Sequence, residues 1–121
     1  ELALLHDVGG LLAAVRAGAK LTIVCINNGG GGIFDFLPVA EHAEREAYER
    51  HIATPAGLDL ERLAALAGIP YTLDDAERGL AQPGLLELRS GRERNVALHR
   101  ELSERVSVSL SRKPGTRGLT S

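Results

Sequence analysis

The sequence predicts an α/β domain with three layers, an open and mostly parallel β-sheet with helices on both of its faces. Amphipathic helical segments alternate with short apolar segments at 21–26, 69–73 and 84–90, the pattern expected of βαβ units. The segment 21–26, LTIVCI, is a continuous apolar run, typical of a strand covered on both faces. Because three parallel strands bury little core, we expect an incomplete domain that lacks earlier strands.

The first two helices are predicted from apolar spacing and from residues that begin and end helices. The segment 7–16 places its apolar residues on one face, with Asp7 at its start and Gly18 just beyond its end. The segment 59–67 repeats this arrangement, with Asp59 as its N-cap and a glycine directly after it. Both segments are therefore expected to pack one apolar face on the sheet.

The remaining helical segments are more polar. The segment 39–50 is strongly charged and is predicted to form a solvated helix, with a mobile flap over a binding site as the alternative. A short helix is predicted at 74–80 and a longer one at 93–106. The longer helix should pack apolar residues spaced four apart, namely Leu98, Leu102 and Val106. We expect residues 107–121 to form a disordered or non-native tail.

Composition excludes several classes of function. The chain has 121 residues, of which 44% are hydrophobic and 25% are charged, as in globular domains. With 14 Lys and Arg against 16 Asp and Glu, it has neither the basic surface of a nucleic-acid-binding protein nor a polybasic membrane anchor. No apolar run reaches the roughly 18 residues of a transmembrane helix. The lone Cys25 indicates a reducing, cytoplasmic compartment, and the lack of methionine suggests that Glu1 is a cut edge within a longer protein.

The strongest candidate for a binding site follows the strand at 21–26. That strand ends at Asn27 and Asn28, and four glycines, Gly29–Gly32, come next. Ligands of open α/β sheets bind beyond the carboxyl ends of strands, and glycines let the main chain approach a phosphate or a metal. The Asn28 amide oxygen suits Mg²⁺ or Ca²⁺, and Glu1 could add a carboxylate. The alternative is a simple turn, since the loop matches neither GxxxxGK[ST] nor GxGxxG.

A family resemblance is carried by three segments, ELALLHDVGGLL, LTIVCINNGGGGIFDFLP and ATPAGLDLERLAALAGIPY. They resemble the C-terminal, diphosphate-binding domain of thiamine-diphosphate enzymes. The patterns LHD-x-x-GLL, NN-x-GGGIF-x-x-LP and TP-x-x-x-D narrow the resemblance to the 2-succinyl-5-enolpyruvyl-6-hydroxy-3-cyclohexene-1-carboxylate synthases of menaquinone biosynthesis. The resemblance covers about residues 1–106 and implies the thiamine-diphosphate-binding fold.

The resemblance also implies roles for individual residues. Mg²⁺, with Mn²⁺ as an alternative, would bridge the cofactor diphosphate to the Glu1 carboxylate, the Asn28 side chain and the Gly30 carbonyl. The family motif has Gly-Asp where this chain has Glu1, so the carboxylate here carries one extra methylene. Residues implied in cofactor binding are Asn28, Gly30, Gly31, Gly32 and Ile33, and those implied in the substrate pocket are Ile33, Phe34 and Leu37. Without the resemblance, Phe34 and Leu37 could simply be core residues.

The activity implied by the resemblance is that of a transferase. It decarboxylates 2-oxoglutarate and adds the succinyl semialdehyde unit to isochorismate, within a homodimer or homotetramer of the longer enzyme. The glutamate that activates the cofactor belongs to the family's N-terminal domain, so we expect no catalytic residue in this segment and no activity from it alone. The alternatives are another thiamine-diphosphate decarboxylase or carboligase, similar to acetolactate synthase, and a flavodoxin-like, non-catalytic binding module.

Overall fold

A three-stranded parallel sheet forms the centre of the chain. The computed structural model describes residues 1–111, and residues 112–121 lie outside the described part. The strands are arranged in the order β1-β3-β2, with bounds β1 (Thr22–Asn27), β2 (Tyr71–Leu73) and β3 (Gly84–Arg89). Asn27 pairs with Arg89, so the carboxyl ends of β1 and β3 lie at the same edge. The predicted parallel α/β architecture is confirmed.

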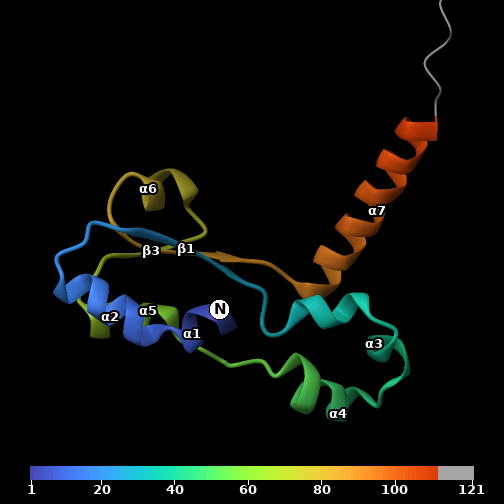
Figure 1. Cartoon of the computed structure of the whole chain (residues 1–121), viewed down its shortest axis with the longest axis horizontal. Coiled ribbons are helices and arrows are strands. Elements are labelled where there is room, and N and C mark those ends of the chain that lie inside the picture. The colour runs from blue at the N-terminus through green and yellow to red at the C-terminus, as the bar shows by residue number, and fades with distance from the viewer. Residues whose placement is uncertain (112–121) are drawn as a thin grey trace, which may run out of the picture.

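Helices cover both faces of this sheet (Figure 1). One face carries α1 (Leu2–His6), α2 (Val8–Arg16) and α5 (Leu60–Ala67), and the other carries α6 (Ala76–Leu80). The core lies on the first face, where Leu60 and Ala64 of α5 pack against Cys25 and Leu85. Burial raises the pKa of the Cys25 thiol, as expected of an inert thiol in a core.

The predicted helix ends at Asp59, Gly68 and Asp7 are confirmed. Asp59 caps α5 by accepting the Arg62 N–H at 3.0 Å, and Gly68 ends it in the left-handed region at φ +70°. Asp7 accepts the Gly10 N–H at 3.1 Å and caps α2. The chain bends at Asp7, so a separate short helix, α1, connects Glu1 to α2.

The prediction that the segment 21–26 is covered on both faces is wrong within residues 1–111. Val24 is 47% exposed and Ile26 is 62% exposed, because β1 is an edge strand and α6 lies over the other two strands. Gly79 of α6 packs so closely on β3 that a Cβ there would lie 2.7 Å from Leu86 Cδ1. The second face of β1 is therefore open.

The charged segment that follows the glycine loop differs from the prediction of one helix over 39–50. After η1 (Gly32–Phe36), it contains three short helices, α3 (Val39–His42), α4 (Arg45–Tyr48) and η2 (Glu49–Ala53), the last a π-helix. The break falls at Ala43, which is extended. Glu44 then caps α4 by accepting the N–H groups of Glu46 and Ala47. These helices lie beyond the carboxyl ends of the strands (Figure 1).

The last helix, α7 (Arg92–Ser111), extends away from the sheet (Figure 1). It continues five residues past the predicted end at 106, so residues 107–111 of the expected tail are helical. It has no buried residue within the described chain, so the predicted packing of Leu98, Leu102 and Val106 is wrong there. No helix in residues 1–111 combines the length and apolar character needed to cross a membrane.

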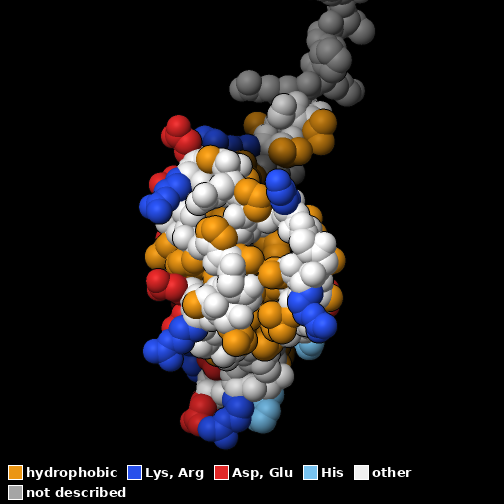
Figure 2. All heavy atoms as spheres, turned by 90° about the vertical axis from the view of Figure 1, so that its left-hand side faces the viewer, with side chains coloured by type: hydrophobic (Ala, Val, Ile, Leu, Met, Phe, Trp, Pro, Cys, Tyr) orange, Lys and Arg blue, Asp and Glu red, His pale blue; other side chains and the backbone are white. Residues whose placement is uncertain are grey.

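The opposite end of the sheet is apolar. A cavity of about 80 Å³ lies where the strands begin and is lined by residues that include Leu11, Leu21 and Ile69. Figure 2 looks onto this end of the molecule and shows hydrophobic side chains across its middle. The residues of the candidate metal site lie at the other end of the sheet, near the carboxyl end of β1.

Candidate metal and diphosphate site

The glycine loop is held tightly against the residue that ends η2. Gly29 and Gly30 have φ of +74° and +131°, which L side chains rarely adopt. A Cβ on Gly30 would lie 2.6 Å from the carbonyl oxygen of Ala53, and the Gly31 N–H donates to that same oxygen at 2.6 Å. Ala53 is fully buried. The loop therefore needs glycine at Gly30 for both its backbone angles and its close main-chain contact.

The three residues predicted to bind metal, Glu1, Asn28 and Gly30, lie together at this loop. The terminal amide of Asn28 reaches within 3.0 Å of Glu1 Oε2 and 2.8 Å of the Gly30 carbonyl oxygen, and its NH₂ group donates a hydrogen bond to each. Turning the amide over would place its oxygen at the same point. Three oxygens would then face one another, an arrangement that a cation between them would stabilise.

The surroundings of Glu1 fit a cation. Its Oε1 atom is buried and has no hydrogen-bond partner within residues 1–111, while its Oε2 atom accepts the Asn28 main-chain N–H at 3.3 Å. An unpaired buried carboxylate oxygen is costly, and a bound cation would remove that cost. The described chain contains no cluster of three His, Cys, Asp or Glu side chains suited to a metal. The candidate donors are instead one carboxylate, one amide and one carbonyl, a hard oxygen set that suits Mg²⁺.

Gly31 and Gly32 provide space but few free donors. A Cβ on Gly32 would lie 2.5 Å from a terminal atom of the Asn28 amide, so only glycine leaves that amide in place. A Cβ on Gly31 would lie 2.9 Å from Cδ2 of Phe34. The Gly32 N–H donates to Gly30 at 2.9 Å, and the Gly31 N–H is engaged as described above. These two residues therefore offer a bare main chain and not free N–H groups.

The three predicted pocket residues lie in and just after η1 and are exposed. Ile33 is 74% exposed, Phe34 40% and Leu37 49%. The alternative in which Phe34 and Leu37 belong to the core is wrong within the described chain. Their proposed role beside a cofactor ring stays a prediction, and it requires other protein segments to complete the pocket.

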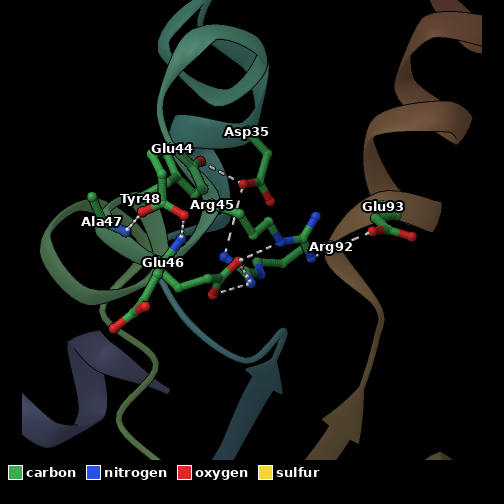
Figure 3. Close-up of polar contacts among 9 residues, drawn as sticks. Asp35, Glu44, Arg45, Glu46, Ala47, Tyr48, Arg92 and Glu93 are labelled. Carbon is green, nitrogen blue, oxygen red and sulfur yellow. Dashed lines mark hydrogen bonds and ion pairs between the residues drawn. The ribbon is translucent and has the colours of Figure 1, made fainter.

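A cluster of charged residues joins the segments around the loop (Figure 3). Arg92, at the start of α7, donates from Nη2 to both carboxylate oxygens of Glu49 at 2.7 Å. Its Nη1 lies 3.8 Å from Asp35 Oδ1 of η1, and that same oxygen accepts the Tyr48 hydroxyl at 2.5 Å. The Arg92 and Glu49 side chains are only 16% and 30% exposed. The cluster thereby links η1, η2 and α7.

The environment keeps these groups in the protonation states that their contacts need. Burial and the hydrogen bond to Asp35 raise the pKa of Tyr48 to about 12, so its hydroxyl stays a donor. Burial disfavours the Arg92 cation, but the hydrogen bond to Glu49 and the nearby Asp35 charge outweigh it and raise the pKa of Arg92. The sequence analysis did not identify this cluster, because its members are far apart in the chain and form no motif.

A groove leads from the candidate metal site along the open edge of the sheet. It has a volume of about 660 Å³ and is lined by Glu1, by apolar residues of α1 and α2, and by β1 from Ile23 to Ile26. The main-chain nitrogen of Glu1 donates to the Ile26 carbonyl at 3.2 Å and so holds Glu1 beside β1. The site therefore lies at an edge where the sheet could be extended.

Comparison with known proteins identifies the family of this chain. The chain is 44% identical to a 2-succinyl-5-enolpyruvyl-6-hydroxy-3-cyclohexene-1-carboxylate synthase of Myxococcus xanthus over 94% of its own length. Synthases of the same name from Bacillus velezensis and Natronomonas pharaonis are 43% and 49% identical over 84% and 65% of the chain. The chain belongs to this synthase family. It covers only 21%, 19% and 13% of these three relatives, and no protein-family model matches it.

Membership of the synthase family confirms the resemblance drawn from the three sequence segments, including the match to the C-terminal domain. The chain spans about a fifth of the length of most of the curated relatives described. The relatives are named as synthases, and the chain aligns with only part of each of them. The flavodoxin-like alternative is therefore wrong.

Proposed function

We propose that this segment holds the diphosphate of thiamine diphosphate through a divalent cation bound by Glu1, Asn28 and Gly30. The observation that carries the proposal is that the Asn28 amide lies between the Glu1 carboxylate and the Gly30 carbonyl, with a buried Glu1 oxygen left unpaired. Mg²⁺ suits this oxygen set, and Mn²⁺ accepts the same ligands. The extra methylene of Glu1 is compatible with this role, because its carboxylate already reaches the Asn28 main chain.

Within the whole synthase we propose the reaction that the family resemblance implies. 2-Oxoglutarate is decarboxylated and the succinyl semialdehyde unit is added to isochorismate. Thiamine diphosphate supplies the carbanion chemistry, and this segment binds and orients the cofactor. Gly31 and Gly32 would let the diphosphate approach a bare main chain, and the exposed Ile33, Phe34 and Leu37 would form an apolar wall beside the thiazolium ring.

The proposal also covers the assembly around the segment. The groove along β1 and the exposed residues of η1 support a site that other segments of a homo-oligomeric synthase complete. The balanced charge supports small-molecule substrates and no nucleic-acid partner. The single buried thiol supports a reducing, cytoplasmic location.

The test is cofactor binding by a full-length synthase that carries this segment. We expect Asn28→Ala to weaken Mg²⁺-dependent binding of thiamine diphosphate by more than about tenfold in calorimetry. The control is Gln82→Ala, which removes an exposed carboxamide just before β3, at the other end of the sheet. Unchanged affinity in Asn28→Ala would refute the assignment of the metal ligands.

A second measurement addresses the substrates. We expect turnover of isochorismate with 2-oxoglutarate and none with pyruvate as the sole keto acid. Turnover of pyruvate alone would favour the alternative similar to acetolactate synthase. The cofactor-binding assignment would survive that result, since both kinds of enzyme use the same cofactor.

A further inference from the structure

A glutamate is fully buried in the central strand, close to the candidate metal site. Glu87 lies on β3 and is 0% exposed. Its Oε1 atom accepts from Asn27 Nδ2 and from Arg89 Nε, each at 2.8 Å, and its Oε2 atom accepts the Tyr71 hydroxyl at 2.5 Å. The carboxylate is therefore satisfied by donors from all three strands.

Glu87 remains ionised in this environment. Burial alone would raise the pKa of Glu87, but the hydrogen bonds from Arg89, Tyr71 and Asn27 outweigh burial and lower it. An ionised carboxylate only accepts hydrogen bonds. Asn27 must therefore turn its NH₂ group toward Glu87, and its oxygen then faces away from the carboxylate.

The oxygen of Asn27 is used by the glycine loop. Asn27 Oδ1 accepts the main-chain N–H of Gly29 at 3.2 Å, a contact that directs the loop just after β1. Gly29 lies between Asn28 and Gly30, whose oxygens are the proposed ligands. Glu87 thus fixes the orientation of the Asn27 amide, and that amide in turn contacts the loop at Gly29.

We propose that Glu87 is a positioning residue for the metal-binding loop, acting through the orientation of the Asn27 amide. The proposal rests on the proposed function for its metal part. Stability alone does not explain a carboxylate here, because apolar replacements of buried ionic groups are often neutral or stabilising. Outer-sphere partners of metal sites typically change metal affinity by about 10- to 100-fold when they are removed.

The test is the substitution of Glu87 in the full-length synthase that carries this segment. Glu87→Leu removes the acceptor of the Asn27 NH₂ group, so the Asn27 oxygen is no longer held toward the Gly29 N–H. We expect Mn²⁺ affinity, measured by electron paramagnetic resonance, to fall about tenfold. Hydrogen exchange of the Gly29 amide should become faster even without metal or cofactor.

Two further variants separate positioning from general disruption. Glu87→Gln keeps an oxygen that accepts from Asn27 and Arg89, and its NH₂ group can donate to the Tyr71 hydroxyl, so we expect both measurements to stay within about twofold of wild type. Tyr71→Phe removes one donor to Glu87 but leaves the Asn27 contact, and we expect it also to keep the Mn²⁺ affinity and the slow exchange at Gly29. The control, Glu77→Gln, changes an exposed carboxylate on α6 over the other face of the sheet and should leave both measurements unchanged.

Two outcomes would overturn the inference. One is Mn²⁺ affinity and Gly29 exchange in Glu87→Leu within about twofold of wild type. The other is a loss of the same size in Tyr71→Phe, which would indicate a merely structural role. A wild-type synthase that binds no Mn²⁺ with thiamine diphosphate would instead contradict the proposed function, whereas Gly29 exchange would still report on the Glu87–Asn27 contact.

Discussion

Both carboxylate oxygens of Glu49 lie 2.7 Å from Nη2 of Arg92. This pair joins the start of α7 to η2, and η2 ends at Ala53, whose carbonyl oxygen accepts the Gly31 N–H. Arg92 also lies beside the loop directly, since a Cβ on Gly32 would come within 3.4 Å of its Cγ. An ion pair between distant parts of the sequence therefore supports the back of the glycine loop.

Breaking this pair should destabilise the fold. We expect Glu49→Gln to lower the free energy of unfolding by about 2 kcal/mol, because a largely buried guanidinium loses the nearer of its two carboxylate partners. Urea denaturation would measure the change. The matched control is Glu101→Gln, which breaks the exposed pair with Arg105 on α7 and should cost less than about 0.5 kcal/mol. Equal effects of the two variants would contradict a supporting role for Arg92.

The space left by Gly32 should matter more for binding than for stability. In Gly32→Ala the new methyl group would displace the Asn28 amide, which can swing aside at little cost to folding. We expect Mg²⁺-dependent binding of thiamine diphosphate to weaken by more than about tenfold in calorimetry. Gly9→Ala is the comparison, since a Cβ there meets open space on α2 and should stabilise the helix by up to about 1 kcal/mol. Wild-type affinity in Gly32→Ala would argue against the ligand role of Asn28.

The two tyrosines of the chain should ionise at a higher pH than a free tyrosine does. Burial, with a hydrogen bond to Glu87 for Tyr71 and to Asp35 for Tyr48, raises both pKa values from 10.0 to about 12. Because the folded-state pKa is raised, the stabilising contribution is complete below pH 10 and is lost as pH rises toward 12. This contribution to the free energy of unfolding is up to about 3 kcal/mol for each tyrosine.

Tyrosinate absorbance during an alkaline titration would test this expectation. The difference between wild type and Tyr71→Phe isolates one hydroxyl, and Tyr48→Phe isolates the other. We also expect Tyr71→Phe to be less sensitive to pH than wild type between pH 10 and 12 in urea denaturation. A difference titration centred near 10 would show that Tyr71 does not hold its proton against Glu87.

The open strand edge should make the segment associate when it is expressed alone. Within residues 1–111, β1 has one unpaired edge, and its exposed face carries Val24 and Ile26. Exposed apolar edge strands promote pairing with other chains, and a lysine on the edge opposes this. We expect Val24→Lys to reduce self-association in light scattering, and Leu110→Lys, at an exposed position of α7, to have a smaller effect. A larger effect of Leu110→Lys would place the association on α7 instead.

Local signals predicted much of this fold. Asp59 is followed by an apolar stripe and a glycine, and each of these residues acts within a few positions of itself. The same holds for Asp7 and for the strand that ends at the glycine loop. The sequence also located the loop beyond a strand end, since β-branched residues change there to asparagine and glycine.

Features set by distant contacts were not predicted. Glu87 has the same sequence signal as an exposed strand residue, and its burial depends on Tyr71 and Asn27 from two other strands. The helix break at Ala43 arises because the Glu44 side chain offers its own acceptors to α4. The exposure of Val24 depends on which strand lies at the edge, and strand order is not a local property.

The contact between Gly31 and Ala53 involves only main-chain atoms. The exposed side chains of Ile33, Phe34 and Leu37 lie between these two residues and take no part in that contact. They can consequently be exchanged without altering it. Under the proposed function, substitutions at these three positions would reshape the apolar wall and leave the proposed cation ligands in place.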